Sequence, residues 1–156
     1  MSRIARMASA LLLSYAAGCV GFLFVDGVSS AWYDALAKPS FTPPYSVFIV
    51  VWFVLYTFMG LALGIVLLKQ PKTRAIEGWV ACFLVQLACN AAWPIFFFGL
   101  HALFTAFADA VLLSILLLVV FFGAWEIDKR AGVLLLPYLL WILFADVLNL
   151  MIWYMN

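Results

Sequence analysis

Long apolar segments recur along this chain, and they constrain its fold more than any other feature. Five stretches carry at most one charged side chain each, and they cover residues 7–25, 45–68, 76–98, 102–123 and 131–154. Segments of about 20 apolar residues are long enough to cross the hydrocarbon core of a bilayer as α-helices. A helix also satisfies its own backbone hydrogen bonds where no water is present. The sequence therefore predicts an all-α integral membrane protein, a bundle of five transmembrane helices.

The composition agrees with this prediction. Hydrophobic residues make up 69% of the chain and charged residues 10%, whereas about 25% of the residues in soluble domains are charged. The five segments and their connections use nearly all of residues 1–156. We therefore expect a single membrane domain without a separate soluble one.

Basic side chains are segregated along the sequence. With five crossings, seven of the eight Lys and Arg residues fall on one side of the membrane and only Lys38 on the other. Short cytoplasmic loops are enriched in Lys and Arg. We therefore expect the N-terminus to be cytoplasmic, and the 26–43 connection and the C-terminus to lie outside. The seven residues are Arg3, Arg6, Lys69, Lys72, Arg74, Lys129 and Arg130.

The first connection, residues 26–43, has an unusual composition. It contains Trp32 and Tyr33 and leads into a proline-rich segment that runs from Pro39 to Pro44. Irregular backbone is not tolerated against lipid hydrocarbon, and proline fixes φ. A connection rich in rings and fixed backbone angles therefore indicates a lid over a cavity rather than a slack linker.

Polar and aromatic residues share one face of the 76–98 segment. Steps of four, three and four residues separate Gln86, Asn90, Trp93 and Phe97. This spacing places the four side chains on one side of a helix. Pro94 leaves the carbonyl of Asn90 without its usual helical partner, so a kink is expected there. A kinked stripe of two amides and two large rings predicts a pocket wall.

Three tryptophans, Trp52, Trp93 and Trp141, lie well inside the predicted spans. A buried indole needs an acceptor for its N–H group and offers a flat face for stacking. If the three rings face inward, they form a slot for a planar, mostly apolar ligand. The alternative is that they only pack the core. Trp141 shares its helix face with Ala145 and Leu148.

Two acids, Asp109 and Asp146, also lie within predicted spans. An ionised side chain at that depth costs about 3 kcal/mol on insertion scales. Each acid could relay protons or contact a ligand, or it could be hydrogen-bonded and fix helix packing. Asn149, one turn after Asp146, is a local partner for the structural alternative. Asp146 is rotated by about 140° from Trp141 around the helix, so the two need not serve one site.

Conventional catalytic sets are missing from the sequence. His101 is the only histidine, so no Ser/His/Asp or Cys/His arrangement is expected. Cys19, Cys82 and Cys89 lie within apolar runs and are expected to pack as small hydrophobic residues. There is no glycine-rich phosphate loop and no basic nucleic-acid face. We expect no metal, no required cofactor and no nucleic-acid partner.

The segment from Trp32 to Pro44 carries a recognisable motif, Trp-Tyr-Asp-Ala-Leu-Ala-Lys-Pro-Ser-Phe-Thr-Pro-Pro. The chain resembles bacterial members of the TspO, or tryptophan-rich sensory protein, family, which is related to the mitochondrial translocator protein, the peripheral-type benzodiazepine receptor. The resemblance covers essentially the whole chain. Further matching residues are Val51, Trp52, Tyr56, Gln86, Leu87, Asn90, Trp93, Asp109, the run from Pro137 to Trp141, Phe144, Ala145, Leu148 and Asn149.

The resemblance implies a five-helix bundle, usually a homodimer, whose pocket beneath the first loop binds porphyrins, sterols and benzodiazepine-type or isoquinoline drugs. A porphyrin of the protoporphyrin IX type is the expected ligand. By position, the first two matched residues form the lid and the others line the walls. The expected ligand-binding residues are Trp32, Tyr33, Trp52, Tyr56, Gln86, Asn90, Trp93, Trp141, Ala145 and Leu148.

Three functions stay open at this point. The leading one is a membrane receptor or regulatory protein for porphyrins and related flat hydrophobic ligands. The second is a light- and oxygen-dependent porphyrin-degrading enzyme, for which the resemblance implies catalytic roles for Trp52 and Trp141. The third is a transporter of tetrapyrroles or other amphipathic molecules, coupled to protons through Asp109 or Asp146. Five spans without an internal repeat argue against the third.

Two positions depart from the family pattern. The sterol-recognition pattern at the end of the last helix needs a basic residue after an aromatic one, and residues 150–156 contain none. This absence argues against sterol binding there. The second is Asp146, where relatives commonly carry Thr; an added acid near the pocket wall could change ligand choice or pH response.

Overall fold

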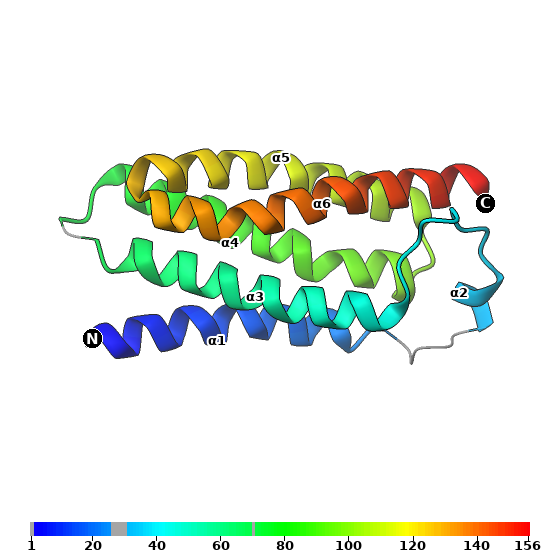
Figure 1. Cartoon of the computed structure of the whole chain (residues 1–156), viewed down its shortest axis with the longest axis horizontal. Coiled ribbons are helices and arrows are strands. Elements are labelled where there is room, and N and C mark those ends of the chain that lie inside the picture. Colours follow the sequence, from blue (N-terminus) through cyan, green and yellow to red (C-terminus); the bar gives the residue numbers. More distant parts are fainter. Residues whose placement is uncertain (1, 26–30, 70) are drawn as a thin grey trace.

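A computed structural model describes residues 2–25, 31–69 and 71–156. It contains five long helices, which confirms the predicted fold class (Figure 1). All five are long and apolar enough to cross a membrane. A short helix and a π-helical turn complete the described structure. The elements are α1 (Arg3–Phe22), α2 (Ala31–Ala35), α3 (Tyr45–Leu67), α4 (Arg74–Pro94), η1 (Ile95–Gly99), α5 (Leu103–Ile127) and α6 (Lys129–Met155).

Local capping explains where three of the long helices begin. The Ser2 side chain accepts a hydrogen bond from the Ala5 N–H, so α1 starts earlier than the apolar pattern suggests. Thr73 caps α4 in the same way, through the Ile76 N–H. Asp128 caps α6 while its own N–H donates to the Ala124 carbonyl at the end of α5. The connection between α5 and α6 is therefore a very tight turn.

The five long helices form a closed ring around a common interior. Helix α1 packs against α3 and α4, α4 packs against α5, α5 against α6, and α6 returns to α3. The kink predicted beside Pro94 takes the form of a change of helix type, because α4 continues directly into η1. This π-helical turn displaces the last residues of the α4 stripe relative to a regular helix.

Small residues are used inside the chain to bring helices together. Gly60 of α3 faces α1 so closely that an added Cβ would come within 2.8 Å of the Leu11 Cα atom. On α5, Ala106 and Ala110 are buried as well. The small-residue stripes on α3 and α5 therefore serve packing within one copy.

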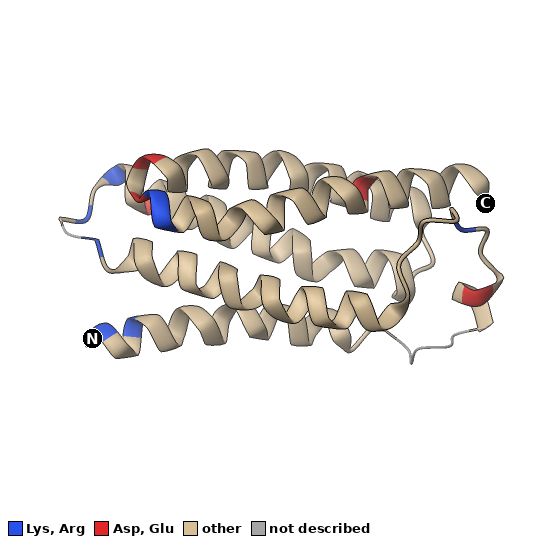
Figure 2. Ribbon diagram, viewed as in Figure 1, with Lys and Arg blue, Asp and Glu red and all other residues tan. Residues whose placement is uncertain are grey.

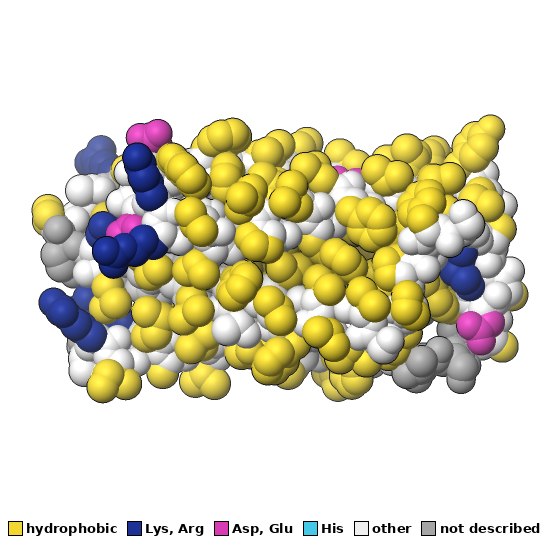
Figure 3. All heavy atoms as spheres, in the orientation of Figure 1, with side chains coloured by type: hydrophobic (Ala, Val, Ile, Leu, Met, Phe, Trp, Pro, Cys, Tyr) yellow, Lys and Arg dark blue, Asp and Glu magenta, His cyan; other side chains and the backbone are white. Residues whose placement is uncertain are grey.

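The two ends of the bundle differ in charge (Figure 2). The basic residues predicted to share a side lie at the end where α1 begins and where α5 turns into α6, and Lys38 lies at the opposite end. The surface between the ends is mostly hydrophobic (Figure 3). At the basic end Lys69 and Asp128 form an ion pair of 2.7 Å. Their hydrogen bond, together with the Arg130 N–H, lowers the pKa of Asp128 below its usual range. The orientation across the membrane stays a prediction.

Candidate functional site

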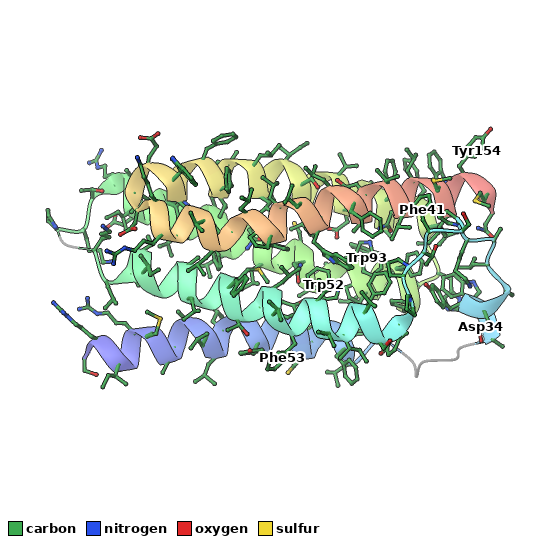
Figure 4. The ribbon with its side chains drawn as sticks, viewed as in Figure 1. Asp34, Phe41, Trp52, Phe53, Trp93 and Tyr154 are labelled. Atoms are coloured by element: carbon green, nitrogen blue, oxygen red, sulfur yellow. The ribbon has the colours of Figure 1, made fainter. Side chains whose placement is uncertain are left out.

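A cavity of about 940 Å³ lies in the half of the bundle beneath residues 31–44. All five long helices and η1 contribute to its wall, which is made mostly of aromatic and aliphatic side chains. Figure 4 shows Trp52 of α3 and Trp93 of α4 in the interior of the bundle, whereas Tyr154 points outward. A partly enclosed apolar space of this size suits a drug-sized or larger flat molecule.

Most of the residues predicted to bind a ligand meet at this cavity. Two of them, Trp32 and Gln86, are not part of its lining. The residues that do line it are Tyr33, Trp52, Tyr56, Asn90, Trp93, Trp141, Ala145 and Leu148. The helix faces identified from periodicity therefore converge in space.

A hydrogen-bonded layer forms the floor of the cavity. The Tyr56 hydroxyl donates to Asn90 Oδ1 at 2.6 Å, and Asn90 Nδ2 donates to the Tyr138 hydroxyl at 2.9 Å. Tyr138 in turn donates to Gln86 Oε1 at 3.1 Å. Tyr138 and Gln86 are fully buried below the lining. Gln86 thus acts beneath the cavity, through Tyr138, and sequence reasoning gave Tyr138 no such role.

The α4 wall is held by α6. Trp93 Nε1 donates to Asn149 Oδ1 at 3.0 Å, and Asn149 Nδ2 donates to the Ala145 carbonyl at 2.8 Å. The Trp93 ring also stacks on Phe97, with centroids 4.8 Å apart. These contacts fix the plane of the indole. The suggested hydrogen bond between Asn149 and Asp146 is wrong. Asn149 accepts from Trp93, and Asp146 accepts from Ser114 of α5.

The α3 and α6 walls present two further indoles. Trp52 stacks on Tyr56 with a centroid distance of 5.5 Å. Trp141 makes an edge-on contact with Phe48, also at 5.5 Å. The N–H group of Trp141 is enclosed and has no acceptor among the described residues. Trp141 itself lines the cavity, so this unpaired donor belongs to the cavity wall.

The described part of the predicted lid, residues 31–43, is anchored to the bundle; residues 26–30 of that loop lie outside the described residues. Trp32 stacks on His101 with ring centroids 3.9 Å apart, and it is not part of the cavity lining. Tyr33 contacts Phe97 and Phe98 of η1. Burial, and then the charge of Asp34, raise the pKa of Tyr33 above its ordinary value. His101 had no predicted role, since a lone histidine in a tight connection gives no periodic signal.

Two further contacts tie the lid down. The Lys38 ammonium group donates to the Tyr33 carbonyl and lies over the Tyr33 ring, 4.3 Å from its centroid. The Asn156 side chain brackets Ala37, accepting from its N–H at 2.9 Å and donating to its carbonyl at 3.0 Å. Asn156, which follows α6, therefore holds the first connection in place.

The two acids within the spans have different surroundings. Asp146 lines the cavity, and its Oδ2 atom accepts a hydrogen bond from the Ser114 hydroxyl of α5. Asp109 is absent from the lining. One oxygen of each acid is enclosed without a partner among the described residues. Those residues also contain no cluster of three or more potential metal ligands.

Comparison with known proteins gives a consistent match over nearly the whole chain. Residues 3–155 match the model of the TspO/MBR family. The tryptophan-rich protein TspO of Chlorobaculum tepidum is 35% identical over 154 residues, covering 99% of this chain and 98% of that protein. Protein CrtK of Rhodobacter capsulatus is 37% identical over 145 residues, covering 90% and 86%. The human translocator protein is 36% identical over 138 residues, covering 87% and 82%.

Proposed function

The chain belongs to the TspO/MBR family, and from this premise we propose that it is a membrane receptor that binds porphyrins and related flat hydrophobic molecules beneath residues 31–44. The observation that supports the proposal best is the convergence of Trp52, Trp93 and Trp141 on one cavity of about 940 Å³. Indole faces stack favourably on extended ring systems. Three such faces on separate helices suit a broad, planar guest better than a compact one.

Polar groups at the cavity would orient such a guest. The enclosed Trp141 N–H can donate to an acceptor on the ring or its substituents. Lys38 lines the mouth of the cavity and is the one basic residue among the described lining residues. We place the carboxylates of a porphyrin near Lys38, because an ionised carboxylate is costly deeper in the span.

Titration of the protein in lipid nanodiscs with protoporphyrin IX tests this function. Binding should quench the fluorescence of the cavity tryptophans, and Trp141→Ala should raise Kd roughly tenfold, through loss of stacking and of one donor. Trp153→Ala is the matched control, since Trp153 does not line the cavity. The absence of saturable quenching at micromolar protoporphyrin, or equal Kd values for the two variants, would contradict the proposal.

A second candidate is light- and oxygen-dependent degradation of the bound porphyrin. It is favoured by one observation: Trp52 and Trp141 face the same cavity from α3 and α6. A ring bound between them would place two oxidisable indoles beside the photosensitiser. Illumination of the loaded protein in air should then give products that differ from those of porphyrin bleached in detergent. Identical products, or no change on replacing both tryptophans by Phe, would exclude an enzymatic role.

We also propose that the protein forms a homodimer. Its small-residue stripes on α3 and α5 are covered within one copy, as Gly60 and Ala106 illustrate. The interface would therefore use larger side chains that remain exposed to lipid. Cross-linking in native membranes tests this proposal, and a product of monomer mass alone would refute it.

A further inference from the structure

Asp146 is half-buried at the cavity wall, with a fixed position and one oxygen that has no hydrogen-bond partner among the described residues. Its Oδ2 atom accepts a hydrogen bond from Ser114, and this contact across α5 and α6 fixes the direction of the carboxyl group. Its Oδ1 atom is enclosed, and no described residue donates to it. Asp146 also belongs to the lining of the cavity. The Asp146 carboxyl group therefore belongs to the wall of a space that a ligand can enter, with one of its oxygens unpaired.

No nearby cation neutralises this carboxyl group. Among the described lining residues, the charged side chains are Asp34, Lys38 and Asp146. Lys38 is engaged at the mouth with the carbonyl groups of Tyr33 and Asp34. The ion pair found among the described residues, Lys69 with Asp128, lies at the opposite end of the bundle.

We propose that Asp146 makes the cavity selective for flat hydrophobic molecules that carry an N–H donor at their edge, above all a protonated amine. A buried acceptor without a donor carries a desolvation penalty, which is larger when it is charged. A ligand N–H group removes this penalty and forms a charge-assisted hydrogen bond. A hydrocarbon of the same shape does neither. The inference rests on the proposed binding function of the same cavity and adds the chemical class of the preferred guest.

Asp109 provides an internal comparison. Like Asp146, it lies within a span and has an enclosed oxygen without a partner among the described residues. Unlike Asp146, it does not line the cavity. A change at Asp109 should therefore leave ligand preference untouched, even if it alters stability.

The test uses two fluorescent probes of nearly equal shape, 1-pyrenemethylamine and 1-methylpyrene. The first carries a protonated amine at neutral pH, and the second carries no donor. Binding to the protein in zwitterionic nanodiscs is followed by energy transfer from tryptophan to pyrene, and empty nanodiscs correct for partitioning into lipid. We expect the wild-type protein to bind the amine at least tenfold more tightly than the hydrocarbon, as befits a hydrogen bond to a charged group.

Two matched variants assign this preference to one side chain. Asp146→Asn should abolish it, because the new amide can accept from Ser114 only by turning its NH₂ group toward the ligand. Asp109→Asn should keep the wild-type ratio. Equal affinities of the wild type for both probes, or a preserved ratio in Asp146→Asn, would overturn the inference. Protoporphyrin IX titration of the same samples reports on the proposed function separately, so failure of selectivity is distinguishable from failure of binding.

Discussion

The two halves of this bundle are built from the same five helices and yet differ in packing. In the basic half, side chains such as Met59, Phe83 and Leu117 are completely buried. In the half beneath the lid, Trp52, Trp93 and Trp141 are only partly buried and surround a cavity. Side chains in the first half fill the interior at high density, whereas the three indoles of the second half leave a space between them. The comparison suggests that one half provides stability and the other provides space.

The boundary between the halves is the hydrogen-bonded floor. Tyr56 and Asn90 line the cavity above it, and Tyr138 and Gln86 lie buried below. The floor therefore separates residues whose loss should reduce stability from residues whose loss should reduce binding.

Phe83→Ala removes a completely buried ring from the packed half. We expect the free energy of unfolding to fall by about 3–5 kcal/mol, because the neighbours cannot fill the space left behind. Unfolding in SDS-containing mixed micelles measures the change. Phe53→Ala is the control, since Phe53 is 64% exposed. Equal losses in the two variants would mean that the basic half is not tightly packed.

Tyr138→Phe removes the hydroxyl group that joins Asn90 to Gln86 in the floor. We expect a loss of about 1–3 kcal/mol in stability, because two buried amides lose a partner. A weaker affinity for protoporphyrin IX should accompany it, since Asn90 then moves more freely. Tyr154→Phe, at an 87% exposed position, is the control. Unchanged stability and affinity would show that the floor does not couple the halves.

Asn156→Ala removes both hydrogen bonds that hold Ala37. Exposed hydrogen bonds compete with water, so we expect a loss of about 1 kcal/mol, felt mainly in the lid. Stopped-flow measurement of protoporphyrin release should then show dissociation about five times faster, with the SDS unfolding midpoint unchanged. Asn156→Gln keeps the amide group but lengthens the side chain, so it tests whether the position of the amide matters. An unaltered release rate in Asn156→Ala would show that this contact does not control how fast the ligand leaves.

Lys69→Met removes the ion pair with Asp128 at the basic end. The folded protein lowers the pKa of Asp128, so the pair stabilises the fold above the ordinary carboxyl pKa of about 3.9 and is lost as pH falls through the lower folded value. We expect a cost of about 0.2–1 kcal/mol near neutral pH, as for surface pairs. Wild type and variant should converge in acid, and a difference that persists there would contradict the electrostatic explanation.

Much of this fold follows from the sequence, because apolar length and helical periodicity are local properties. The stripe that contains Gln86 and Asn90 was recognisable from spacing alone, and so was the inward position of Trp93. Pairings between helices were not recognisable, because they depend on how each helix is rotated and shifted against its neighbours. This is why Ser114 was missed as the partner of Asp146. It is also why the sequence could not show that Trp32 stacks on His101 and is not part of the cavity lining.

The contact between Asn156 and Ala37 joins residues that are 119 positions apart in sequence. The two hydrogen bonds close residues 37–156 into one loop, so the end of α6 and the lid are held together. Any motion that unwinds the final turn of α6 would therefore also loosen the lid. A fluorescent label or affinity tag attached next to Asn156 would disturb this contact and alter what it was meant to report. The opposite terminus, at the far end of the bundle, is the safer attachment point (Figure 1).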